Sequence, residues 1–147
     1  MNTASPPLDE FFIQAEIAFR FLEDEYGFVR QSLATTLHSN PFTLRYENAA
    51  TAVVIEGVSW GSAAVVSVGR KGGRPGNKFE LVPLWTLARL EGEGNEKVLT
   101  VEGQVAQLGA SAAALPRLAG AALKGDFSAI DAARAYLEER VLKASKP

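Results

Sequence analysis

The sequence predicts an α+β fold, with an N-terminal helix and Ala-rich C-terminal helices packed on one face of an antiparallel β-meander of about 4–5 strands. Three observations predict it. Apolar residues recur at helical spacing near both ends of the chain. Between residues 28 and 82 the pattern changes to short alternating or Val-rich runs that are typical of strands. Short links join these runs, and short links connect antiparallel neighbours because a parallel pair needs a long crossover.

The chain of 147 residues has the size of one domain, and we predict a single α+β domain over residues 1–147. Residues 1–6 are expected to form a flexible N-terminus and residues 69–78 a mobile, basic, Gly-rich loop. The apolar fraction of 47% is too high for a disordered chain. No segment approaches the ~18–20 apolar residues of a membrane span, and the first residues do not resemble a signal peptide. These observations favour a cytoplasmic protein with no membrane contact.

The first helix is expected over about residues 7–25, because Ser5-Pro6-Pro7 is typical of a helix start and Gly27 of a helix end. At 100° per residue, its core face is predicted to carry Phe11, Phe12, Ala15, Ala18, Phe19, Leu22 and Tyr26. A second apolar stripe, formed by Ile13, Ile17 and Phe21, lies beside the polar face. We favour burial of this stripe under the C-terminal helices, and the alternative is a partner-binding or dimer face.

The strands are predicted over residues 42–47, 52–58 and 63–68, with weaker signals at residues 28–37 and 79–82. Residues 42–47 alternate apolar with polar side chains, which predicts a half-buried strand. Trp60 follows in a turn between two strands, where a position at the edge of the core and a position on a contact surface are equally supported.

Three further helices are expected over residues 83–90, 101–124 and 128–144. Trp85 of the first is predicted in the core, and the second is expected to be kinked near Pro116. The third begins with a sequence that resembles a capping box, Ser128-Ala129-Ile130-Asp131. Its inner stripe is predicted to consist of Ile130, Ala133, Leu137 and Val141.

Most catalytic and metal chemistry is disfavoured by composition. The chain has no cysteine, which excludes disulfides, thiolate metal sites and thiol catalysis. Its one histidine, His38, is predicted in a turn, and no nucleophile–base motif accompanies it. We therefore expect no catalytic residue, no metal and no cofactor, and a protein that is not an enzyme.

The formal net charge of −2 hides an uneven distribution. Residues 1–60 contain three basic and eight acidic side chains, so 3 − 8 = −5, whereas residues 70–89 contain five basic and one acidic, so 5 − 1 = +4. The acidic excess lies largely on the first helix, where the run Glu23-Asp24-Glu25 is interpreted as a solvated helix end rather than a cation site.

The basic excess lies largely in the loop at residues 69–78, the most distinctive motif of the chain. Its glycine N–H groups form a candidate anion nest, surrounded by the anion- or nucleic-acid-binding candidates Arg70, Lys71, Arg74 and Lys78. The loop lacks the residue order of a P-loop, and no aromatic side chain interleaves its cations. A solvated turn, whose charges discourage edge pairing, is the favoured interpretation.

Three segments carry a resemblance to known proteins: residues 21–28 (FLEDEYGF), 44–48 (LRYEN) and 123–128 (LKGDFS). Together they resemble a loose group of small uncharacterised bacterial α+β proteins, some of which are classed as candidate toxin-immunity proteins. The resemblance spans most of the chain in order and implies the same fold class and no catalytic residue. The loop at residues 69–78 is not part of it.

Three functions are consistent with these observations. The first is a non-enzymatic protein-interaction protein, immunity-like, that binds a basic partner or a second copy of itself through the acidic first helix or an open sheet face. Its candidate interface residues are Ile13, Ile17, Phe21 and Trp60. The second is nucleic-acid or phosphate binding through residues 70–78, and the third is small-molecule binding or catalysis in a pocket between the sheet and the helices.

Overall fold

A computed structural model describes residues 7–31, 43–58, 63–73, 80–90 and 104–145, and within these ranges it confirms the α+β class. The described strands form a five-stranded antiparallel sheet in the order β1-β2-β3-β4-β5, so each strand pairs with its neighbour in sequence. They are β1 (Val29–Arg30), β2 (Thr43–Glu47), β3 (Thr51–Val58), β4 (Ala63–Arg70) and β5 (Leu81–Pro83). This is the meander that the short links predicted.

The predicted first helix is two helices, α1 (Pro7–Ala18) and α2 (Arg20–Tyr26). Phe19 interrupts them with φ −106° and ψ 14°, yet its side chain is fully buried, as are those of Phe11 and Leu22 on either side. Gly27 ends α2 in the left-handed region with φ 69°, a conformation that glycine adopts without a Cβ penalty. The helix end predicted from this glycine is therefore confirmed.

The later helices are α3 (Leu84–Leu90), α5 (Gln104–Leu123) and α6 (Ser128–Ser145). In α5 the backbone leaves helical geometry at Ala119, three residues beyond Pro116, which confirms the kink. The predicted capping box of α6 is wrong, because the Ser128 N–H and hydroxyl both donate to Asp126 Oδ1, at 3.0 and 2.8 Å. Within the described ranges, no helix combines the length and the apolar character that crossing a bilayer requires.

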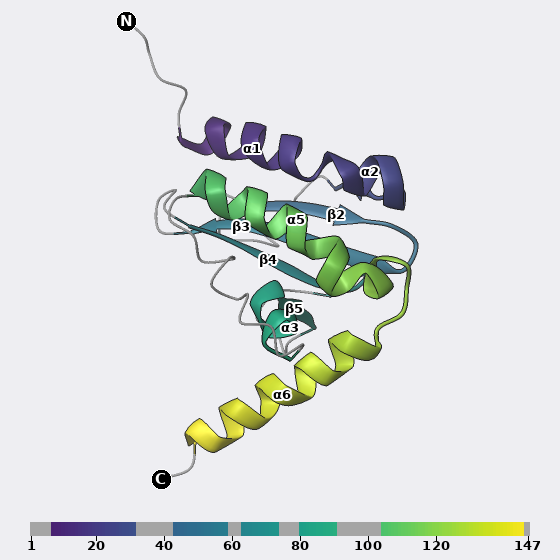
Figure 1. The fold of residues 1–147 in the computed structure, drawn as a ribbon, viewed down its shortest axis with the longest axis vertical. Helices are drawn as coiled ribbons and strands as arrows, with labels where there is room; N and C mark the ends of the chain where they lie inside the picture. Colours follow the sequence, from purple (N-terminus) through teal and green to yellow (C-terminus); the bar gives the residue numbers. More distant parts are fainter. Residues whose placement is uncertain (1–6, 32–42, 59–62, 74–79, 91–103, 146–147) are drawn as a thin grey trace, which may run out of the picture.

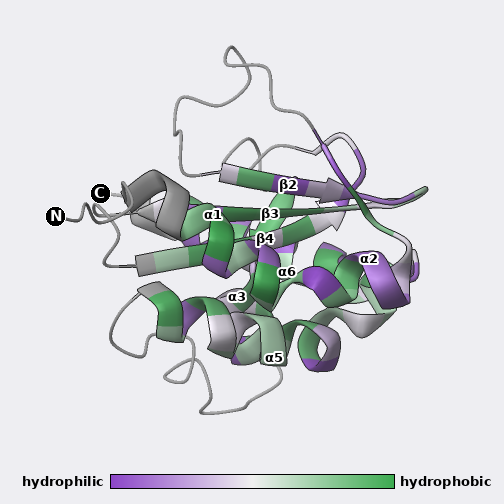
Figure 2. Ribbon diagram, turned by 90° about the horizontal axis from the view of Figure 1, so that it is seen from above, coloured by the Kyte–Doolittle hydropathy of each residue, from purple (hydrophilic) through white to green (hydrophobic). Residues whose placement is uncertain are grey.

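The helices lie on one side of the sheet, with α1, α2 and α5 over its strands and α3 and α6 towards β5 (Figure 1). The view from above shows the same layering (Figure 2). Alternate residues of the strands face the helices and share one core with them. The buried strand residues of this core are Leu44, Tyr46, Val53, Ile55, Ala64, Val66, Val68 and Val82.

The opposite face of the sheet is also buried, which corrects two expectations. A second cluster of Ala52, Val54 and Leu81 is at most 1% exposed. On the same face, Thr43 is 2% and Arg45 8% exposed. The strand at residues 43–47 is therefore buried on both faces rather than half-buried, and the open sheet face expected as a binding surface is closed.

Two side chains that were predicted to lie in the core, Trp85 and Val141, are on helices α3 and α6. Trp85 is partly buried and packs against the main core, as expected. On α6, Ile130, Ala133 and Leu137 are buried, but Val141 is 53% exposed. The prediction for Val141 is wrong because the C-terminal half of α6 extends beyond the body of the domain (Figure 1).

Replacement of two buried threonines by valine is expected to change the free energy of unfolding in opposite directions. The Thr86 hydroxyl on α3 is fully buried and has no hydrogen-bond partner among the described residues, whereas the equally buried Thr51 hydroxyl donates to the Ala122 carbonyl at 2.6 Å. Thr86→Val should therefore raise the free energy of unfolding by about 1 kcal/mol, because it removes an unsatisfied polar group without changing shape. Thr51→Val, the matched control, should lower it by about 1–2 kcal/mol. Urea denaturation measures both, and loss of stability in both variants would contradict the prediction.

Candidate functional site

Arg70, the first cation of the basic loop, is engaged within the protein. It ends β4, and its guanidinium donates to both carboxylate oxygens of Asp131 at 2.7 and 3.0 Å. The same guanidinium lies 4.7 Å from the ring centroid of Phe127, within the range of a cation–π contact. The hydrogen bond from Arg70 lowers the pKa of the Asp131 carboxyl. Arg70 therefore connects the sheet to the first turn of α6.

The candidate anion nest contains an anion of the protein itself. The Gly72 N–H, at φ 86°, donates to Glu47 Oε2 at 3.2 Å, and the Arg45 guanidinium donates to the same oxygen at 2.8 and 3.0 Å. Burial alone would raise the pKa of the Glu47 carboxyl, but the bonds from Arg45 and Gly72 hold it below its ordinary value. Glu47 thus occupies the position that an external anion would need.

The rest of the basic loop is only partly within the described residues. Residues 69 and 70 belong to β4 rather than to a loop, and Lys71 is exposed in the turn that follows. Arg74 and Lys78 lie outside the described residues, as do His38 and Trp60. The described structure therefore places only Arg70 and Lys71 of the four cations named as one site. Among the residues that it describes, no group of three or more His, Asp or Glu side chains could hold a metal ion.

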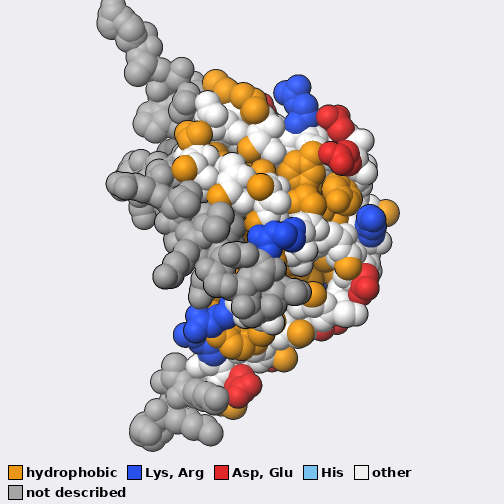
Figure 3. Space-filling model, viewed as in Figure 1, with side chains coloured by type: hydrophobic (Ala, Val, Ile, Leu, Met, Phe, Trp, Pro, Cys, Tyr) orange, Lys and Arg blue, Asp and Glu red, His pale blue; other side chains and the backbone are white. Residues whose placement is uncertain are grey.

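The second apolar stripe of the first helix is the clearest unmatched feature. Ile13 is 47% and Ile17 62% exposed on α1, whereas Phe21 on α2 is partly buried and packs against the main core. The favoured burial of the stripe is therefore wrong for both isoleucines. The fully buried Phe11 and Ala15 face the core, and this turns Ile13 and Ile17 to the opposite side. In the space-filling view, hydrophobic side chains lie along the upper outline, over α1 (Figure 3).

The exposed isoleucines begin a line of exposed residues, which we call the outer strip. It consists of Ile13 and Ile17 on α1 and of Arg20 and Asp24 on α2, and each pair has the spacing of four residues that places side chains on one face of a helix. The charged side chains beside the strip differ in whether they form ion pairs within the protein. Glu16 forms an ion pair with Arg30, whose guanidinium also lies 5.5 Å from the ring centroid of Phe12.

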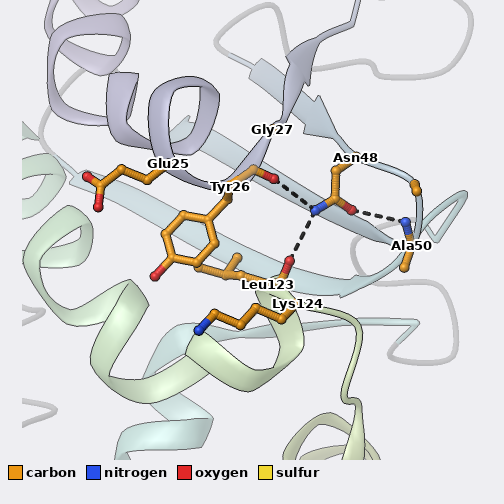
Figure 4. A pocket seen from close by; sticks show the side chains of 8 residues that line it. Glu25, Tyr26, Gly27, Asn48, Ala50, Leu123 and Lys124 are labelled. Carbon is orange, nitrogen blue, oxygen red and sulfur yellow. Dashed lines mark hydrogen bonds between the residues drawn. The ribbon is translucent and has the colours of Figure 1, made fainter.

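A hollow of about 430 Å³ lies where the ends of α2 and α5 meet the turn between β2 and β3 (Figure 4). Eight residues line it: Glu25, Tyr26, Gly27, Asn48, Ala49, Ala50, Leu123 and Lys124. A hollow of this volume can hold a small ligand, so it is a candidate for the pocket that was predicted between the sheet and the helices.

Asn48 in this hollow is fully occupied by hydrogen bonds within the protein. Its Nδ2 donates to the carbonyls of Tyr26 and Leu123 at 3.3 and 3.0 Å, and its Oδ1 accepts from the N–H groups of Ala50 and Thr51 at 3.0 and 2.8 Å. A carboxamide has two donor hydrogens and two acceptor lone pairs, so none remains for a ligand. Asn48 therefore joins the ends of α2 and α5 to the β2–β3 turn, and we call this set of hydrogen bonds the junction at Asn48.

Sequence reasoning missed the role of Asn48, although a signal was present. The three segments that carry the resemblance, residues 21–28, 44–48 and 123–128, each contribute to the lining of this hollow. The pattern they share thus coincides with a structural junction rather than with a set of reactive groups. No family model, curated protein or solved structure matches the chain.

Of the three candidate sites, the outer strip is the one at which the described structure exposes large aliphatic side chains. The basic loop uses Arg70 and the Gly72 N–H internally, and the hollow uses Asn48 internally. Two large apolar side chains on a helix surface cannot perform acid–base or nucleophilic chemistry, but they can contribute to the core of an interface.

The junction at Asn48 predicts a large and specific loss of stability. Asn48→Ala should lower the free energy of unfolding by about 2–4 kcal/mol, because two carbonyls and two N–H groups lose a protein partner at once. Gln31→Ala is the matched control, since the Gln31 amide also donates to a carbonyl, that of Val29, but in an exposed position. It should cost less than about 0.5 kcal/mol. Urea denaturation compares the two, and equal losses would contradict the junction.

The pair between Arg70 and Asp131 predicts a pH-dependent contribution to stability. The pKa of Asp131 is lowered in the folded protein from its ordinary 3.8, so the contribution is present above that value and is lost as pH falls through the lowered pKa. Asp131→Asn should therefore be less stable than the parent at neutral pH, and the gap should close in strong acid. Urea midpoints measured from pH 7 to about pH 2.5 test this.

Asp24→Asn is the control for this pH series, since it removes an exposed carboxylate that forms no ion pair within the described residues. A gap between Asp131→Asn and the parent that stays constant over the whole pH range would show that Arg70 does not stabilise the ionised form of Asp131.

Proposed function

We propose that the protein is a non-enzymatic protein-interaction protein that binds another protein through the outer strip of α1 and α2. One observation carries the proposal: Ile13 and Ile17, one helical turn apart, are 47% and 62% exposed. Covering side chains that are already half-buried would yield about 1 kcal/mol each from the hydrophobic effect. Paired apolar anchors at this spacing are how a helix surface engages a partner.

The more specific part of the proposal, an immunity-like role, has different support. It comes from the resemblance of residues 21–28, 44–48 and 123–128 to proteins classed as candidate toxin-immunity proteins. An immunity protein neutralises its toxin by binding it, so a protein-binding surface and the absence of a catalytic motif in the sequence are consistent with this role. Trp60, also named as a contact candidate, lies outside the described residues.

The two alternative functions have less support. Nucleic-acid or phosphate binding through the basic loop would use Arg70 and the Gly72 N–H, but both already bind carboxylates of the protein. Small-molecule binding in the hollow at Asn48 would need free polar groups at its base, and those of Asn48 are satisfied internally. Lys71 at the loop and Glu25 and Lys124 at the hollow are exposed, but they are charged side chains that water solvates, whereas the two isoleucines expose apolar surface.

The test compares two double variants that remove similar exposed apolar surface. Ile13→Ser with Ile17→Ser alters the outer strip, and Val141→Ser with Leu142→Ser alters side chains that are 53% and 60% exposed on α6. Each tagged protein is used to capture binding proteins from a lysate of the native host, followed by mass spectrometry. We expect a protein that the parent and the α6 variant retain and that the α1 variant loses.

Circular dichroism and thermal unfolding of all three proteins show whether each variant is folded. A captured protein that is retained equally by the folded α1 variant, or lost equally by both variants, would contradict binding through the outer strip.

A further inference from the structure

We infer that the partner presents a basic, amphipathic helix to the outer strip, with apolar side chains over Ile13 and Ile17 and Lys or Arg side chains over α2. The inference rests on the proposed function and names the chemistry of the partner. Its basis is the order of exposed side chains, which are apolar on α1 at Ile13 and Ile17, whereas α2 carries Glu23, Asp24 and Glu25 against the single cation Arg20.

The geometry of the strip suits a helical ligand. From Ile13 to Asp24 the strip spans 12 residues on two consecutive helices, α1 and α2, and a partner helix of about three turns has a comparable length. The exposed positions are spaced by four and three residues, the same spacing that the anchors of an amphipathic helix have.

The charges on α2 indicate that the binding surface of the partner is positively charged. Glu23, Asp24 and Glu25 are all exposed on α2, and within the described residues none of them forms an ion pair. The neighbouring Glu16 differs, because Arg30 already neutralises it. Three adjacent unpaired carboxylates repel one another, and cations of a partner would relieve that repulsion and accelerate encounter.

A second copy of this protein fits the strip less well. On this side of the molecule it would offer Arg20 as a cation, while Arg30 is already bound to Glu16. The exposed surface of α2 carries three carboxylates and this one cation, so a symmetric pair leaves an excess of negative charge unmatched. Two isoleucines also supply only a fraction of the ~800 Å² per partner that a stable dimer interface buries.

The test uses defined peptides, so that it does not depend on an unidentified ligand. The probe is a fluorescent synthetic helix of about 18 residues with Leu on one face and Lys on the other, and its counterpart has Glu at every Lys position. Fluorescence anisotropy measures the affinity of each peptide for the full chain at roughly 50 mM and 0.5 M salt. We expect the Leu/Lys peptide to bind, more weakly at high salt, and the Leu/Glu peptide not to bind.

Variants locate the binding surface. Glu23→Gln with Asp24→Asn should weaken the Leu/Lys peptide about fivefold at low salt, as expected for two exposed charge pairs. The control Glu138→Gln with Glu139→Gln removes the same charge from exposed positions on α6 and should leave affinity unchanged. Ile13→Ser with Ile17→Ser should weaken the binding of the peptide about thirtyfold.

The possible results distinguish a failure of the basic partner from a failure of the proposed apolar interface. If the isoleucine variant loses binding but the peptide's charge and the α2 carboxylates do not matter, the basic partner is overturned and the apolar interface stands. Equal binding to the parent and the isoleucine variant overturns both. A dimer in sedimentation velocity that dissociates on Ile13→Ser with Ile17→Ser identifies a second copy as the occupant and also overturns the basic partner.

Discussion

The four hydrogen bonds of the Asn48 carboxamide are the interaction on which the arrangement of the layers depends. They join the β2–β3 turn to Tyr26 at the end of α2 and to Leu123 at the end of α5. Two helix C-termini meet there, and each carries partial negative charge on carbonyls that have no partner within their helix. The Nδ2 group satisfies one carbonyl of each, which allows the two helix ends to lie together against the sheet.

This junction also determines which side of the first helix faces water. With α2 and α5 held at one end, α1 lies beside α5 and buries Phe11, Ala15 and Phe19. A helix that packs through one face cannot bury the opposite face of the same turns. Ile13 and Ile17 therefore lie on the side of α1 that faces away from this core, as a consequence of the packing that stabilises the domain.

The sequence predicted local features well and long-range pairs poorly. Period, Gly27 and Pro116 act within a few residues, so the helix end, the kink and the meander were predictable. Alternation at residues 43–47 correctly separated two faces, but it did not show that the face with Arg45 is buried too. The bonds between Asn48 and Leu123 and between Arg70 and Asp131 join residues 75 and 61 positions apart. No local pattern encodes such a pairing.

The charge of the protein likewise depends on long-range pairs, because the fold pairs some charged side chains with each other and leaves others exposed. The net charge of −2 and the basic loop suggested two oppositely charged surfaces of similar weight. Yet Arg70 is paired with Asp131 and Arg45 with Glu47, so the charges of these two arginines are neutralised within the protein. The carboxylates of α2 have no such partners among the described residues. The exposed carboxylates of α2 and the exposed isoleucines of α1 are therefore the features from which we propose a partner that is both apolar and basic.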